Sequence, residues 1–197
     1  ASKSRGLGDV YKRQIQTEKV LKITGSDNVT FLDSIISNNI EVDSIKPSFL
    51  LGPDGKINHW FLIEEKNKEV FVYQDKRELN FILDSLRKYA IRIDCNFEIE
   101  DSKITLQVDL DKATFKTTET KEESVSWNDF ELNNELPTKE IVNTGLLPNE
   151  TKWLDFFVDF EKGCFLGQEQ ASRIKFRGKS RRMLVTNESG IQEIIKI

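Results

Sequence analysis

The chain has 197 residues and a mass of 22.8 kDa, and its 38% hydrophobic and 31% charged residues are typical of one globular domain or two small ones. No apolar run approaches the roughly 20 residues that cross a bilayer, which excludes a membrane-spanning protein. Two cysteines (Cys95 and Cys164) and one histidine (His59) are too few for a disulfide scaffold, a four-ligand zinc site or a resident iron–sulfur cluster. We therefore expect no metal ligands and a reducing, cytoplasmic compartment.

The net charge of −4 is distributed unevenly along the chain. Seven cations and one acid lie between Lys162 and Arg182, so this segment is basic while the remainder is acidic. A short basic segment in an acidic protein favours a site for one anionic ligand over general coating of nucleic acid. The acidic stretch from Glu119 to Glu140 is typical of a solvated linker or loop.

Composition divides the chain into three parts. Residues 1–14 contain two glycines and four cations without a helical or strand period, and GLGDVYKRQ resembles translated sequencing-adapter read-through. We interpret them as a non-native or disordered segment. Residues 15–185 are expected to form the folded domain. Residues 186–197 stop within an alternating apolar pattern, which predicts the start of a truncated carboxy-terminal region.

Apolar periodicity predicts strands and helices in alternation through the first half. The expected elements are, in chain order, a strand at 20–24, a helix capped by Ser26 or Asp27, a hairpin of 48–51 and 57–63 around the turn 52–55, a strand at 70–73, a helix at 76–90, and strands at 91–100 and 104–108. Residues 110–135 are polar and poorly patterned, which indicates a variable loop. The expected fold class is α+β with an antiparallel component.

The most informative segment is KGCFLGQE, which runs from Lys162 to Glu169. Its glycines, Gly163 and Gly167, predict tight backbone geometry or positive φ around Cys164. Lys162 is two residues from the thiol, and a nearby cation favours the thiolate form of a cysteine. A lone cysteine is more often a small hydrophobe packed in a turn. The flanking glycines, lysine and Gln168–Glu169 pair favour a functional thiol.

Cations then occupy every second position, at Arg173, Lys175, Arg177, Lys179 and Arg181. In a strand, these five side chains would share one face, because successive side chains alternate between faces. A solvated strand face is an equally good interpretation. The functional alternative is a ridge that binds a polyanionic tail or RNA phosphates.

The segment KGCFLGQEQASR resembles the YgfZ family, folate-binding proteins related to the glycine-cleavage T-protein. The family signature reads K-G-C-[FY]-x-G-Q-E followed by an arginine, here Arg173, and LPNE with FFVDFEKGC is similar to the family's approach to it. KITGSDNVTFLDSIISNNI and LLGPDGKI are similar to the family's opening and first hairpin. The resemblance covers roughly residues 15–185, and the eight-residue signature is its specific part.

The resemblance implies a tetrahydrofolate-binding accessory protein that supports the maturation or repair of iron–sulfur proteins, including radical enzymes that modify tRNA. It implies a folate-binding unit of two interleaved ferredoxin-like repeats, followed by a small β-barrel that would be largely missing here. The implied functional thiol is Cys164. Its partners would be folate and iron–sulfur proteins or their assembly machinery.

Folate contacts can be assigned to candidate residues. The anionic glutamate tail suits the ridge at Arg173, Lys175 and Arg177. A pterin ring needs an aromatic or apolar wall, for which Trp60, Trp153 and Phe165 are available, although aromatic residues are more often part of the core. The remaining signature residues belong to the same motif: Lys162, Gly163, Gly167, Gln168 and Glu169.

Two alternative functions stay open. An aminomethyltransferase of the T-protein type would place an aspartate after the first hairpin's turn, where this chain has Asn58 and His59. Neither supplies the fixed negative charge that one-carbon transfer requires at the folate nitrogens. An RNA-contacting module built on residues 173–182 ranks last, because the paired aromatic and basic motifs of common RNA-binding folds are absent. We therefore expect an accessory protein rather than an enzyme.

Overall fold

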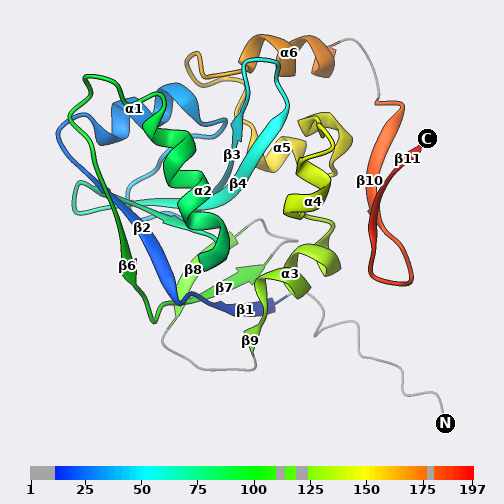
Figure 1. The fold of residues 1–197 in the computed structure, drawn as a ribbon, viewed down its shortest axis with the longest axis horizontal. Helices are drawn as coiled ribbons and strands as arrows, with labels where there is room; N and C mark the ends of the chain where they lie inside the picture. Colours follow the sequence, from blue (N-terminus) through cyan, green and yellow to red (C-terminus); the bar gives the residue numbers. More distant parts are fainter. Residues whose placement is uncertain (1–11, 110–113, 119–123, 177–179) are drawn as a thin grey trace.

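The computed structural model describes residues 12–109, 114–118, 124–176 and 180–197 (Figure 1). The structure is α+β, as expected. The strands are β1 (Lys12–Gln16), β2 (Lys19–Thr24), β3 (Lys46–Leu51), β4 (Ile57–Lys66), β5 (Glu69–Tyr73), β6 (Asn96–Asp101), β7 (Thr105–Asp109), β8 (Thr114–Thr118), β9 (Ser124–Val125), β10 (Arg182–Thr186) and β11 (Gln192–Lys196). The helices are α1 (Asn28–Ile35), α2 (Lys76–Arg87), α3 (Trp127–Asn134), α4 (Lys139–Val142), the 3₁₀ turn η1 (Pro148–Glu150), α5 (Leu154–Phe157) and α6 (Gln168–Phe176).

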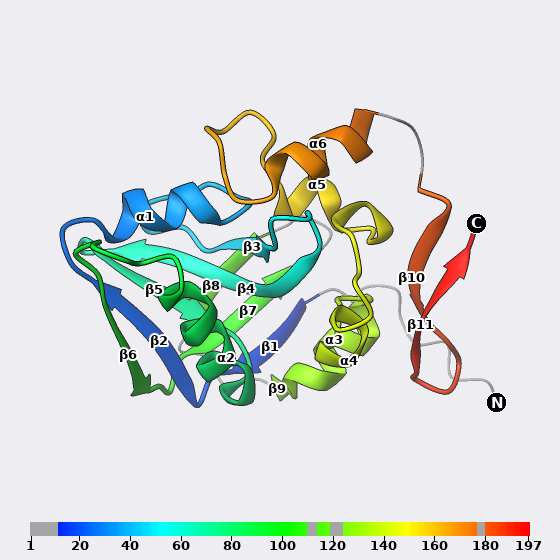
Figure 2. The ribbon, with the colours of Figure 1, turned by 45° about the horizontal axis from the view of Figure 1, so that its top comes forward.

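The strands form a five-stranded sheet, a four-stranded sheet and a separate hairpin. The large sheet has the order β3-β4-β5-β2-β6, with every neighbouring pair antiparallel. The second sheet has the order β8-β7-β1-β9, in which β1 and β9 run parallel. The hairpin of β10 and β11 lies beyond α4 and α6, at the side of the molecule (Figure 2).

The two faces of the large sheet bury two hydrophobic clusters. On β4, Phe61 and Ile63 pack with α1 and α2, whereas Trp60 and Leu62 pack toward the four-stranded sheet and the segments that follow it. This division follows from strand geometry, because successive side chains point to opposite faces. The strands β3, β4 and β5 are buried on both faces, which explains their nearly continuous apolar sequences.

The structure confirms the strands at 20–24 and 70–73, the hairpin around residues 52–55 and the helix that begins at Lys76. Asp27 occupies the N-cap position of α1, as expected, but its side chain makes no capping hydrogen bond. The predicted strand at 91–100 is wrong in its first half, since β6 begins only at Asn96. Arg92 has a φ of 62°, which interrupts an extended strand, and Ile91 is 74% exposed.

The predicted loop at 110–135 contains regular structure in its described part. It holds β8, β9 and α3, whose Trp127 and Phe130 are buried. Ser126 caps α3, because its hydroxyl accepts a hydrogen bond from the Asp129 backbone N–H at 3.0 Å. The interpretation of 119–140 as a solvated stretch is therefore wrong over α3, while residues 119–123 lie outside the described part.

Structure also begins earlier than the boundary at residue 15. Residues 12–14 belong to β1, where Gln14 is buried and pairs with Gln107 of β7 and Ser124 of β9. β1 is an inner strand of the four-stranded sheet, so these residues are part of the fold. Residues 1–11 lie outside the described part of the chain.

Candidate functional site

Lys162 fastens the beginning of the signature segment to the end of α1. Its side chain is 2% exposed, and its ammonium donates hydrogen bonds to the carbonyls of Ile36 at 3.1 Å and Asn38 at 2.9 Å. Its Nζ also lies 3.0 Å from Asp33 Oδ1. Burial lowers the pKa of Lys162, and the Asp33 carboxylate partly offsets this effect. Lys162 therefore directs its charge into the protein, where it satisfies carbonyls past the end of a helix.

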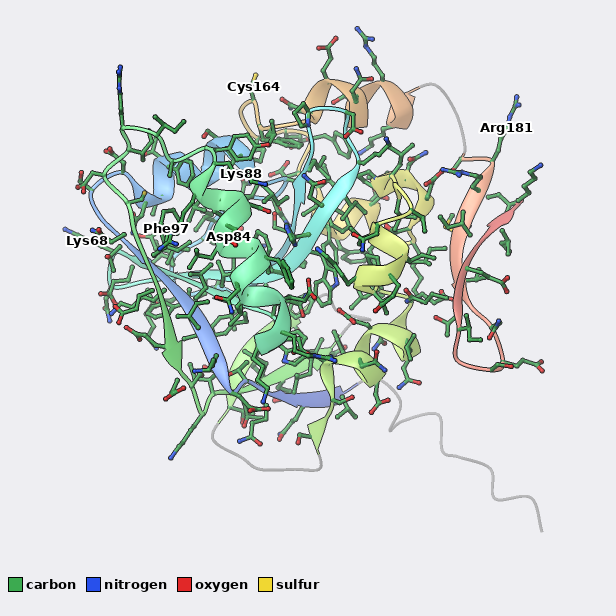
Figure 3. All side chains as sticks on the ribbon, viewed as in Figure 1. Lys68, Asp84, Lys88, Phe97, Cys164 and Arg181 are labelled. Atoms are coloured by element: carbon green, nitrogen blue, oxygen red, sulfur yellow. The ribbon has the colours of Figure 1, made fainter. Side chains whose placement is uncertain are left out.

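Cys164 is exposed at the tip of the loop between Lys162 and α6 (Figure 3). The next side chain, Phe165, is buried, and its ring centroid lies 5.7 Å from Lys162 Nζ. The segment is thus anchored by an inward-facing side chain on each side of the thiol. Such anchoring presents Cys164 to solvent from a short, constrained loop.

Gly167 joins the loop to the turn of the β3–β4 hairpin. Its φ is +78°, and a Cβ there would lie 2.5 Å from the Gly52 carbonyl oxygen and 2.9 Å from Leu51 Cβ. Gly55, on the opposite side of this contact, also has a φ of +78°, and a Cβ there would lie 2.6 Å from Gln170 Cβ. Two glycines from distant parts of the sequence therefore allow α6 to begin directly against the hairpin.

The expectation of tight geometry at both signature glycines is half confirmed. Gly167 meets it through both its φ and its contacts. Gly163 does not, since its φ is not positive and a Cβ there would meet nothing within 4 Å. The steric requirement of the signature therefore lies on the carboxy-terminal side of Cys164. Gln168 follows at once as the first residue of α6, with its N–H bonded to the Phe165 carbonyl at 3.1 Å.

The predicted basic strand is wrong, because Arg173 and Lys175 belong to helix α6. Two residues apart on a helix, their side chains do not share a face. Arg173 forms an ion pair with Glu169 one turn earlier, and Lys175 Nζ lies 3.6 Å from an Asp155 carboxylate oxygen. Arg177 and Lys179 lie outside the described residues, and Arg181 is exposed before β10. The described cations therefore form no continuous ridge.

The two tryptophans proposed for a pterin wall belong to the hydrophobic core. Trp60 is 3% exposed and Trp153 is 7% exposed. Each indole N–H already has a partner, since Trp60 donates to the Pro137 carbonyl at 3.0 Å and Trp153 to the Asn134 carbonyl at 2.9 Å. In this conformation both side chains stabilise the packing of the segment that follows the four-stranded sheet.

A cationic cavity of about 470 Å³ lies beside the same hairpin, and we call it the hairpin cavity. It opens between β4, the end of α2 and the start of α4. Its lysines are Lys56, Lys88 and Lys139, and Asn58 and His59 of β4 lie among them. Lys56 is paired with Asp54 at 2.9 Å, and Lys139 Nζ lies 3.6 Å from Glu78 Oε2. No sequence motif indicates this cavity, because its three lysines are far apart in the chain.

The pKa of His59 reflects both its burial and the positive charge around the hairpin cavity. Its Nε2 is hydrogen-bonded to the Ser85 hydroxyl at 2.9 Å. Burial, followed by the charges of Lys139 and Lys88, lowers the pKa of His59 to about 3. The imidazole is therefore neutral at pH 7, and the lysines make the cavity favourable for an anion.

Among the described residues there is no group of three or more His, Cys, Asp or Glu side chains placed to hold a metal ion. Within the same residues, no helix is both long enough and apolar enough to cross a membrane.

Comparison with known proteins gives limited similarity. No family model and no curated protein matches the chain. A solved structure of glycine cleavage system aminomethyltransferase T from Bartonella henselae is similar, with 12% sequence identity and a TM-score of 0.43. The match covers 66% of this chain and 34% of that one, so this chain spans about a third of that protein. A similarity of this size carries no argument about activity.

Proposed function

We propose that this chain is a folate-binding accessory protein of the YgfZ type that acts in the cytoplasm on iron–sulfur proteins, with Cys164 as its functional thiol. The observation that carries the proposal is the signature segment itself. Its thiol is exposed on a loop that Lys162, Phe165 and Gly167 hold in place. The interleaved ferredoxin-like repeats and a following β-barrel remain part of this proposal.

The hairpin cavity supports folate binding by its charge and position. It adjoins the hairpin turn on which Gly167 and Gln170 pack, so it lies next to the structure that supports the thiol loop. Its lysines complement the carboxylates of a folate glutamate tail. We therefore propose the hairpin cavity, in place of the expected ridge at 173–181, as the seat of that tail.

Aminomethyl transfer is the less favoured alternative. Of the two residues at the expected aspartate position, Asn58 is uncharged and His59 is a buried neutral imidazole bonded to Ser85. Asp54 also lines the cavity, but it is paired with Lys56. These residues supply no unpaired carboxylate for a developing positive charge on folate, which supports binding without transfer.

Folate binding is tested by titrating tetrahydrofolate into the wild-type chain and into Lys88→Glu by calorimetry. Reversing a charge that faces the ligand's carboxylates should weaken binding about ten-fold or more. The matched control is Lys196→Glu, which makes the same charge change at an exposed position of β11 that lines neither the hairpin cavity nor the other cavity discussed below. Equal binding by wild type and Lys88→Glu would remove the hairpin cavity from the proposal.

The role of the thiol is tested separately in cells that lack the endogenous protein. Cys164→Ser should fail to restore the activity of an iron–sulfur enzyme that the wild-type chain restores. Cys95→Ser is the control, because burial and the nearby carboxylates of Asp27 and Asp94 raise the pKa of the Cys95 thiol and disfavour its reactive form. Full rescue by Cys164→Ser would contradict the assignment.

A further inference from the structure

A second cavity, of about 720 Å³, lies between the five-stranded and four-stranded sheets, and we call it the inter-sheet cleft. One wall comes from β4 and β5 where they approach their connecting turn, at the end of β4 opposite the hairpin cavity. The other wall comes from β7, the residues before it, and β8. A volume of this size lies within the range of sites that enclose small organic ligands.

Strand register sets the composition of the β4–β5 wall. Glu64 is opposite Phe71 and Leu62 is opposite Tyr73. Alternate residues share a face, so Glu64, Phe71 and Tyr73 all project toward the four-stranded sheet. The cleft therefore brings an acidic, an aromatic and a phenolic side chain together on one surface.

Glu64 is the decisive residue of the cleft. It is 7% exposed, and one of its carboxylate oxygens, Oε2, accepts a hydrogen bond from the Tyr73 hydroxyl at 2.8 Å. Burial, reinforced by this carboxylate, raises the pKa of the Tyr73 phenol well above its usual value, so Tyr73 keeps its proton and remains a donor. A carboxylate only accepts hydrogen bonds, and burying one is costly unless donors surround it. A ligand edge with N–H donors would complete its environment.

The rest of the cleft offers apolar surface and positive charge. Phe71 and Ile104 are half-buried and offer apolar surface from the two walls. Lys66 and Lys103 are exposed where the cleft meets solvent. Glu69 also lines the cleft, but its charge is balanced by Lys22, whose Nζ lies 3.0 Å from Glu69 Oε1.

We propose that the inter-sheet cleft binds a 2-amino-4-oxopyrimidine ring with an acidic substituent, the chemistry shared by guanine nucleotides and pterin glutamates. The adjacent amino and ring N–H groups of this edge donate to the Glu64 carboxylate, the ring packs between Phe71 and Ile104, and the acidic group binds Lys66 and Lys103. An adenine ring fits poorly, because its ring nitrogen would present a lone pair to the carboxylate. This inference does not depend on the function proposed for the hairpin cavity.

The test is equilibrium binding of guanosine monophosphate, with adenosine monophosphate as the ring control, to wild type and to Glu64→Gln. We expect the guanine nucleotide to bind the wild type at least ten-fold more tightly than the adenine nucleotide, and Glu64→Gln to lose this preference. Glu65→Gln is the matched variant, since it makes the same change on the other face of β4 and should bind as the wild type does. Thermal melting of each variant confirms that it is folded.

Tetrahydrofolate, titrated into the same variants, identifies the source of the ring. Loss of tetrahydrofolate binding in Glu64→Gln but not in Lys88→Glu would place a pterin in the inter-sheet cleft. Loss of tetrahydrofolate binding in Lys88→Glu but not in Glu64→Gln would place folate in the hairpin cavity. The titration of guanosine monophosphate would then be the test of the inter-sheet cleft. Failure of both ligands to bind at the cleft, or equal binding by wild type and Glu64→Gln, would overturn it.

Discussion

The thiol loop at 162–167 and the basic segment that follows it differ in how strongly their sequences specify structure. In the loop, Gly167 has positive φ and direct contacts with a hairpin turn, and the buried side chain of Lys162 has three oxygen partners. In the basic segment, charges at every second position predicted a strand, yet Arg173 and Lys175 lie on helix α6. A glycine that permits a close approach constrains the backbone, whereas solvated charges fit a helix and a strand equally well.

The largest effect on the free energy of unfolding should come from replacing a signature glycine, Gly167, with alanine. Gly167→Ala would place a Cβ 2.5 Å from the Gly52 carbonyl at a φ that disfavours L-residues, so we expect it to lower the free energy of unfolding by about 3 kcal/mol. Gly163→Ala should change it by less than about 0.5 kcal/mol, because the site is open. Urea denaturation measures both, and equal effects would show that the contact with the hairpin is not tight.

Removal of the buried ammonium should have the next largest effect. Lys162→Met leaves Asp33 and two carbonyls without their donor, and we expect a loss of about 2 kcal/mol in the free energy of unfolding. Lys175→Met is the matched variant in the basic segment, and its half-exposed pair with Asp155 should contribute little. If both variants lose the same free energy of unfolding, the contacts of Lys162 do not stabilise the loop.

A pH titration extends the comparison to the strand that supports the loop. His59 has a folded pKa of about 3, below its unfolded value of about 6.5, so only the unfolded chain takes up this proton between these values. The free energy of unfolding should therefore fall by about 1 kcal/mol as the pH decreases from 6.5 to 5.5. Denaturant titrations of His59→Gln should show a shallower slope, and an unchanged slope would contradict a neutral, buried imidazole.

The smallest effect should come from the ion pair on α6. Arg173 and Glu169 are both largely exposed, so Arg173→Ala should lower the free energy of unfolding by about 0.5 kcal/mol or less. Raising the salt concentration should reduce this difference further. A loss as large as that of Lys162→Met would mean that the basic segment is as closely integrated as the loop.

The sequence predicted elements whose apolar residues follow one period without interruption. The β3–β4 hairpin and α2 are of this kind, with buried residues at strand or helical spacing. The strand expected from residue 91 failed because side-chain alternation continues through a turn in which Arg92 is left-handed. Helix α3 was not predicted because only Trp127 and Phe130 are buried along it. Two buried positions are too few to indicate helical periodicity.

The candidate site shows the same limit. KGCFLGQE is contiguous, so Cys164 could be singled out from the sequence, and the structure shows it exposed. The hairpin cavity joins Lys56, Lys88 and Lys139, which come together only after folding. Glu64 and Tyr73 likewise meet across two strands and lie nine residues apart in the sequence. No local pattern distinguishes these side chains from ordinary surface or core residues.

The most direct test of the central claim is calorimetric titration of tetrahydrofolate into the wild-type chain and into Cys164→Ala. We predict that both bind with equal affinity, within about two-fold, because the thiol projects to solvent from a loop anchored by its neighbours. Equal binding would assign folate recognition and the thiol to separate steps. Absence of binding by a folded wild-type chain would contradict the account.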